Sequence, residues 1–153
     1  MARVFEDAFA DLQADMVSIC LEYVEERADK VFVYCSSEMG MIYCNCFFQI
    51  RGDVLKKSKI NSVLSSHERQ YDVSEARQSQ MLGILISDMR KTEKLFQQNG
   101  RTPPVELRMV YDVRSHAYEA KIRYDPICTD TNGINPLSLC DSWFKEEAAK
   151  AKG

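Results

Sequence analysis

The sequence predicts an α+β fold: an antiparallel sheet of four to five strands, from two hairpins, packed against N-terminal, middle and C-terminal helices. Two observations predict it. Residues 105–125 alternate between apolar and polar side chains on both sides of a polar break, which is typical of a hairpin of half-buried strands. Three other segments, near the start, middle and end of the chain, repeat apolar residues at the spacing of an amphipathic helix.

Length and composition are those of one globular domain. With 153 residues, 45% of them hydrophobic and 28% charged, the chain can bury a core without disulfides or metals. We expect a single domain over residues 1–153, frayed at residues 145–153. Glu6, Asp7 and Asp11 stand where a signal peptide is apolar, and no apolar run is long enough to span a membrane, so we expect a cytoplasmic protein.

The first helix is expected from about Val4 to about Ala28. Its apolar stripe recurs at three- and four-residue steps and comprises Phe5, Ala8, Phe9, Leu12, Met16, Ile19, Cys20 and Tyr23. The neighbouring arc is acidic and comprises Asp7, Asp11, Asp15, Glu22, Glu25, Glu26 and Asp29. Almost no basic residue interrupts this arc, because Arg27 is expected to project toward the apolar side.

Residues 30–36 and 41–50 are rich in β-branched and aromatic side chains and predict the first hairpin, with its turn at residues 38–40. A short third strand is expected from Val54 to about Lys59, where three lysines suit an unpaired edge. Residues 60–71 are expected to form a loop. One face of the sheet is expected to pack and the other to stay in water, so the helices should cover one side only.

The middle helix should begin at residues 72–74, where Asp72 or Ser74 can serve as N-cap, and end at Asn99-Gly100. The second hairpin follows over residues 105–124, with its turn at residues 114–116. A last helix is expected from Pro136 to about residue 149, since proline suits a first helical turn.

The sequence carries no recognisable catalytic motif, and we expect neither an enzyme nor a cofactor or metal. The six cysteines are expected to be free thiols. Cys44 and Cys46 should face the same way, as buried small hydrophobes or, alternatively, as part of a metal site. His67 and His116 lie in polar segments, where each is either simply solvated or a base whose partners come from elsewhere in the chain.

Two charged surfaces, one basic and one acidic, each have two possible interpretations. Arg51, Lys56, Lys57 and Lys59 form a small basic patch, which fits a solvated edge strand better than a nucleic-acid site because the pI is near 5.5. The acidic arc of the first helix is either a plain solvated face or a docking surface for a basic protein.

Several segments resemble the YezG-type immunity proteins of bacterial polymorphic toxin systems. The most specific are residues 71–84 (YDVSEARQSQMLGI) and 103–126 (PPVELRMVYDVRSHAYEAKIRYDP), with DSWFKE at residues 141–146. Residues 31–36 (VFVYCS), the later FFQI run and KKSKINSV also fit, whereas the first helix matches only in length and amphipathicity. The resemblance implies a small cytoplasmic antitoxin that binds the toxic C-terminal domain of a polymorphic or contact-dependent growth inhibition toxin, often a nuclease.

We therefore expect a non-catalytic protein whose partner is a cognate toxin domain, with no direct contact to nucleic acid or membrane. Nuclease domains present basic, phosphate-binding surfaces, so an acidic face is their physical counterpart. The family has no short motif that marks its toxin contacts, so charge placement alone selects the expected docking residues: Asp7, Asp11, Asp15, Glu22, Glu25, Glu26 and Asp29, with Asp72, Glu75 and Asp112 as weaker candidates. The alternatives are a small thiol- or histidine-dependent enzyme, a small-molecule-binding domain, or a scaffold whose acidic helix is merely soluble.

Overall fold

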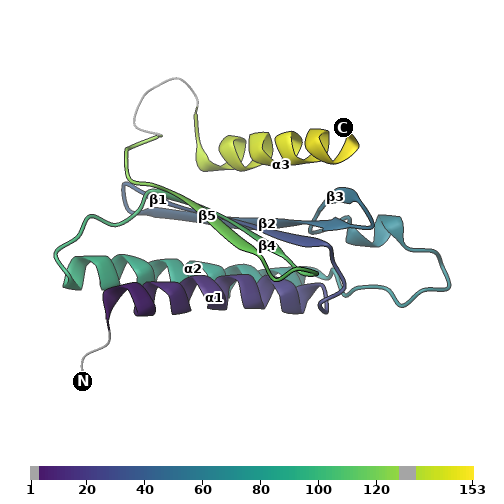
Figure 1. Cartoon of the computed structure of the whole chain (residues 1–153), viewed down its shortest axis with the longest axis horizontal. Helices are drawn as coiled ribbons and strands as arrows, with labels where there is room; N and C mark the ends of the chain where they lie inside the picture. The colour runs from purple at the N-terminus through teal and green to yellow at the C-terminus, as the bar shows by residue number, and fades with distance from the viewer. Residues whose placement is uncertain (1–3, 128–133) are drawn as a thin grey trace.

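The computed structural model describes residues 4–127 and 134–153, which form three layers (Figure 1). Helices α1 (Phe5–Tyr23) and α2 (Glu75–Gln98) lie side by side on one face of a five-stranded antiparallel sheet, and α3 (Pro136–Lys152) lies on the other face. The predicted α+β class, with N-terminal, middle and C-terminal helices packed on an antiparallel sheet, is confirmed.

Two hairpins set side by side build most of the sheet. Its strands are β1 (Lys30–Glu38), β2 (Met41–Ile50), β3 (Asp53–Lys56), β4 (Glu106–Asp112) and β5 (Tyr118–Arg123), in the order β3-β2-β1-β4-β5. Every neighbouring pair is antiparallel. Met39 and Gly40 in the first turn have φ values of 53° and 78°, and such turns match the twist of the flanking strands. The short β3 and the longer β5 are the two edges.

The larger core lies between the sheet and the pair α1 and α2. It takes alternate side chains of the strands and the inward side chains of both helices, among them Met16, Cys20, Val31, Val33, Cys44, Cys46, Phe48, Leu85, Met89, Leu107 and Met109. Each large apolar side chain buried in this way stabilises the fold by about 1.5–3 kcal/mol. A register slip of one residue would turn a whole strand outward, so this burial fixes the strand pairing.

The expectation that helices cover only one side of the sheet is wrong. Phe32, Tyr34 and Phe47 point to the opposite face and are buried there under Trp143 of α3. The Phe47 and Trp143 rings meet edge-to-face with centroids 5.0 Å apart. Aromatic side chains therefore occupy positions on the second face of β1 and β2, and α3 removes them from water.

A buried carboxylate lies on the α3 side of the sheet. Glu106 is 1% exposed, and its two carboxylate oxygens accept from the Tyr34 hydroxyl at 2.6 Å and from Arg108 Nε at 3.2 Å. Burial, followed by the hydrogen bond to this carboxylate, raises the pKa of Tyr34. The Arg108 guanidinium also lies 5.5 Å from the ring centroid of Trp143. The cluster thus links β1, β4 and α3.

Helix α1 ends at Tyr23, earlier than the expected Ala28. Glu25 and Glu26 both adopt left-handed backbone conformations, with φ values of 55° and 59°. The Glu26 amide donates to the Leu21 carbonyl at 3.0 Å, which satisfies one of the last carbonyls of the helix. Tertiary contacts hold this end in place, because the Tyr23 hydroxyl donates to the Lys57 carbonyl at 2.9 Å.

Other boundaries differ by a few residues. The third strand ends at Lys56 rather than Lys59, and the expected loop contains a 3-10 helix, η1 (Ile60–Val63), whose first residue is fully buried. Helix α2 begins after Ser74, whose side chain accepts from the Arg77 amide as an N-cap should. Helix α3 continues to Lys152, so the segment expected to fray is helical; its alanines and lysines favour helix.

Candidate functional site

The outer side of α1 presents four acidic side chains. The opposite side of the helix is buried in the core and comprises Phe9, Met16, Val17, Cys20 and Tyr23. The helical period then brings Asp7, Asp11, Asp15 and Glu22 to the solvent side, where all four are exposed. We call these four residues the α1 acidic face.

Asp15 is also a neighbour of a buried carboxyl group on α2. Asp88 is 3% exposed, and the hydrogen bond and charge of Asp15 act on it. Burial, with these contributions from Asp15, raises the pKa of Asp88 to about 7, against the weaker opposing effect of Lys91. Asp15 thus borders the α1–α2 contact.

The remaining expected docking residues of this segment divide into two kinds. Glu26 is exposed beyond the end of α1. Glu25 instead pairs with Arg69 and with Arg27, the latter at 3.6 Å, and the Asp29 carboxylate accepts from the Gly52 amide at 2.8 Å. The prediction that Glu25 and Asp29 continue the acidic arc of the first helix is therefore wrong. The helix ends before these two residues. Their side chains instead stabilise the turn that follows α1.

Two of the weaker candidates hold turns. Asp72 accepts from the Ser74 amide at 3.0 Å, and Asp112 accepts from the amides of Arg114 and Ser115 at 3.1 and 3.0 Å. These backbone hydrogen bonds lower the pKa of both carboxyl groups. Glu75 is exposed in the first turn of α2, where an acidic side chain suits the helix dipole.

Arg77 is a basic neighbour that the first helix alone did not reveal. From α2, its guanidinium donates to the Glu22 carbonyl at 3.1 Å and lies 5.8 Å from the Tyr23 ring centroid. The acidic residues at the C-terminal end of α1 therefore have a cation beside them. Only the packing of α2 against α1 brings it there.

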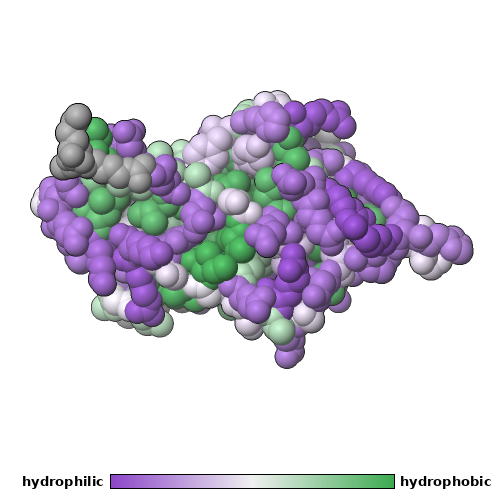
Figure 2. Space-filling model, turned by 90° about the horizontal axis from the view of Figure 1, so that it is seen from below, coloured by the Kyte–Doolittle hydropathy of each residue, from purple (hydrophilic) through white to green (hydrophobic). Residues whose placement is uncertain are grey.

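Two apolar hollows flank α1. One, of about 390 Å³, lies between α1 and the β4–β5 hairpin, and the other, of about 340 Å³, lies between α1 and α2. Ala10, Ala14 and Tyr118 line the first, and Ile19 and Ile84 line the second. Figure 2 shows hydrophobic side chains gathered near the middle of this helical face, with hydrophilic ones around them. The acidic side chains are thus accompanied by apolar surface.

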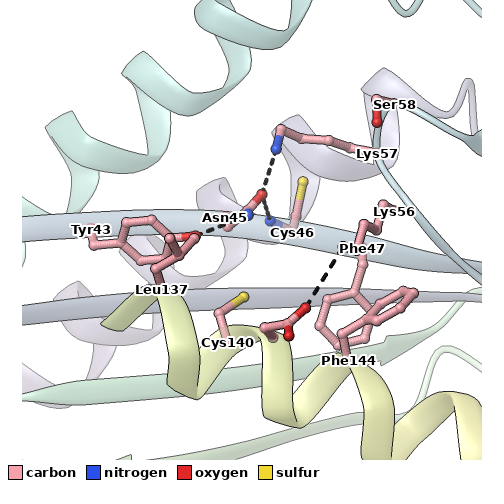
Figure 3. A pocket seen from close by; sticks show the side chains of 11 residues that line it. Tyr43, Asn45, Cys46, Phe47, Lys56, Lys57, Ser58, Leu137, Cys140 and Phe144 are labelled. Atoms are coloured by element: carbon pink, nitrogen blue, oxygen red, sulfur yellow. Dashed lines mark hydrogen bonds and ion pairs between the residues drawn. The ribbon is translucent and has the colours of Figure 1, made fainter. Parts of the chain in front are cut away.

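A smaller hollow of about 130 Å³ lies between β2, β3 and α3 (Figure 3). Lys57 Nζ donates to Asn45 Oδ1 at 2.8 Å, and Lys56 pairs with Asp141 at 3.7 Å. Burial raises the pKa of the Cys140 thiol to about 12. A reactive cysteine needs the opposite shift, so burial works against nucleophilic reactivity of Cys140.

Four other thiols belong to the larger core, and His116 lies in the β4–β5 turn. These four thiols are free and buried, as expected for small hydrophobes; they are Cys20, Cys35, Cys44 and Cys46. Cys128 lies outside the described residues. Burial raises the pKa of Cys20, and in Cys35 a hydrogen bond to Cys44 is the largest cause of the same shift. His116 Nδ1 hydrogen-bonds the Tyr111 hydroxyl at 2.7 Å in the β4–β5 turn. Within residues 4–127 and 134–153, no group of three His, Cys, Asp or Glu could hold a metal ion.

No protein-family model and no curated protein sequence matches the chain. None of the described helices is long and apolar enough to cross a membrane. The α1 acidic face, with the hollows beside it, is the candidate site.

Proposed function

We propose that this chain is an immunity protein that binds a basic toxic domain of a cognate toxin, such as a nuclease domain, and holds it inactive in the cytoplasm of the producing cell. The single observation that carries the proposal is the α1 acidic face. Asp7 and Glu22 are exposed on it and form no ion pair with another described residue. The resemblance of residues 71–84 and 103–126 to YezG-type immunity proteins supports the same class of function.

The mechanism follows from charge and shape. A nuclease domain binds phosphates through lysines and arginines, and a row of carboxylates one helical turn apart attracts the same cations. Because the attraction is long-ranged, it accelerates encounter and disfavours acidic partners. The apolar hollows beside α1 supply surface that gains free energy once water is excluded. The bound protein then covers the substrate groove of the toxin or a site next to it.

The test reverses charge on the α1 acidic face without disturbing the fold. The variant carries Asp7→Lys, Asp11→Lys and Glu22→Lys; Asp15 is kept because its neighbour Asp88 would respond to its replacement. The matched control carries Asp53→Lys, Asp125→Lys and Glu146→Lys, three exposed acidic residues away from α1. Both changes alter the net charge equally, so a difference between the two variants reports position.

The readouts are rescue of growth on co-expression with the toxic domain encoded by the neighbouring gene, and the association rate at low and high salt. The reversed variant should lose rescue, associate about tenfold more slowly at low salt and show a weaker salt dependence. The control should behave like the natural protein. Equal rates and equal salt slopes in both variants would place the docking face elsewhere, and absence of any complex with the natural protein would reject the immunity function.

A further inference from the structure

Within residues 4–127 and 134–153, no strand pairs with the outer edge of β5, which is a row of backbone hydrogen-bonding groups. Among the described strands, β4 alone pairs with β5. The Asp112 amide donates to the Ala117 carbonyl at 2.9 Å, and in an antiparallel ladder such bonds fall on alternate residues. The odd-numbered residues of β5 therefore direct their backbone groups to β4. Tyr118, Ala120 and Ile122 direct theirs away from the sheet.

The same edge overhangs an apolar groove. Helix α1 packs on β1 and β4 and meets β5 through the Tyr118 hydroxyl, which donates to Gln13 Oε1 at 2.5 Å, and a hollow of about 390 Å³ lies between α1 and the β4–β5 hairpin. Ala10, Ala14, Leu21 and Tyr111 line this hollow together with Tyr118, whose side chain is 44% exposed. Ala120 and Ile122 lie on the same face of the sheet and are only partly buried. An added strand would cover this apolar surface and pair the free backbone groups at once.

We propose that the added strand is β5 of a second copy of this chain, paired antiparallel about a two-fold axis at Ala120. This register sets Ala120 opposite Ala120 of the second copy, and Tyr118 opposite Ile122 on the helix-covered face. The outward backbone groups of these residues then form the hydrogen bonds. On the other face Glu119 stands opposite Lys121 of the second copy, and the two-fold axis repeats this ion pair.

Charge selects this register over its neighbours. Glu119, Lys121 and Arg123 are all exposed and share the face away from the helices. Shifting the axis by one residue toward the N-terminus sets Glu119 opposite itself. Shifting it the other way sets Glu119 opposite Arg123 of the second copy but Lys121 opposite itself. Like charges directly opposite across strands are destabilising. The register centred on Ala120 has two attractive pairs and no such contact, and it leaves the α1 acidic face uncovered.

The experiment measures the association constant by sedimentation equilibrium from micromolar concentrations to about 1 mM. Lys121→Glu sets like charges opposite each other at both pairs, and Glu119→Lys does the same with the opposite sign. Each single variant should lower the association constant by about tenfold or more, and the double exchange of the two residues should restore it. Lys94→Glu on the exposed side of α2 is the matched control and should leave the constant unchanged.

A backbone variant tests the strand pairing separately. Ala120→Pro removes an amide that points away from β4, so the monomer keeps its ladder while the central hydrogen bonds of the dimer are lost. Circular dichroism and thermal unfolding show whether this variant folds, and the charge exchange decides the matter if it does not. A protein that stays monomeric at every concentration, or a dimer that neither single charge variant weakens, overturns the proposal. Neither result bears on toxin binding, which the α1 variants test.

Discussion

Asp88 should make the stability of the protein fall as pH rises from about 4 to about 7. Its carboxyl group is buried between α1 and α2, and Oδ2 has no hydrogen-bond partner with an N–H or O–H group among the described residues. Asp15 brings a second carboxyl group to it. Burial is the largest cause that raises the pKa of Asp88 from 3.8 to about 7, and Asp15 adds to it because two carboxyl groups can share a hydrogen bond only while one of them keeps a proton.

The magnitude follows from this shift. Between pH 4 and 7 the native state keeps a proton that the unfolded chain has lost, so the free energy of unfolding decreases as pH rises through that window. A difference of roughly three pKa units corresponds to about 4 kcal/mol, and the water around exposed Asp15 reduces it to about 2 kcal/mol. Asp88→Asn has no such proton, so the variant should be about 2 kcal/mol more stable than the natural protein at pH 8.

Urea unfolding at pH 5 and pH 8, followed by Trp143 fluorescence and circular dichroism, measures the effect. The natural protein should lose stability between these pH values, whereas Asp88→Asn should change much less. Asp7→Asn removes an exposed carboxylate from α1, the helix that carries Asp15, and should keep the pH dependence of the natural protein. If Asp88→Asn and the natural protein lose the same stability between pH 5 and pH 8, then Asp88 carries no raised pKa and the reasoning is refuted.

Three further predictions concern stability, each measured by urea unfolding. Gly83→Ala should add about 1 kcal/mol, because no atom lies within 4 Å of the new Cβ on α2, whereas Gly40→Ala should cost about 1 kcal/mol at a φ of 78°; equal effects would contradict this. Trp143→Ala should cost about 3–5 kcal/mol and expose the amides of α3 to hydrogen exchange; unchanged exchange would show that α3 is held by other contacts. Glu106→Ala should cost about 3 kcal/mol of unfolding free energy by leaving the buried Tyr34 hydroxyl without its acceptor, while Glu106→Gln should cost less. Equal costs would show that this hydrogen bond does not stabilise the fold.

The candidate site could be read from the sequence only in part. A period of 3.6 residues correctly placed Asp7, Asp11, Asp15 and Glu22 on the solvent side of one helix, because that placement depends only on local geometry. It could not show that the helix ends at Tyr23, since the left-handed residues that follow are held by contacts with distant segments. Nor could it show Arg77 or Asp88, because both reach α1 from a helix that begins about fifty residues later.

The sequence by itself determined the elements, their order and the apolar faces that pair them. Alternation in residues 105–125 and helical spacing elsewhere are local patterns, and burial of those patterns fixes the strand register. Tertiary structure alone decided that α3 covers the second face of the sheet, that Glu106 lies buried beneath it and that β5 is an edge strand of the described sheet. The physical reason is that a repeat shows which side of an element is apolar, whereas the segment that covers that side depends on where the rest of the chain can reach.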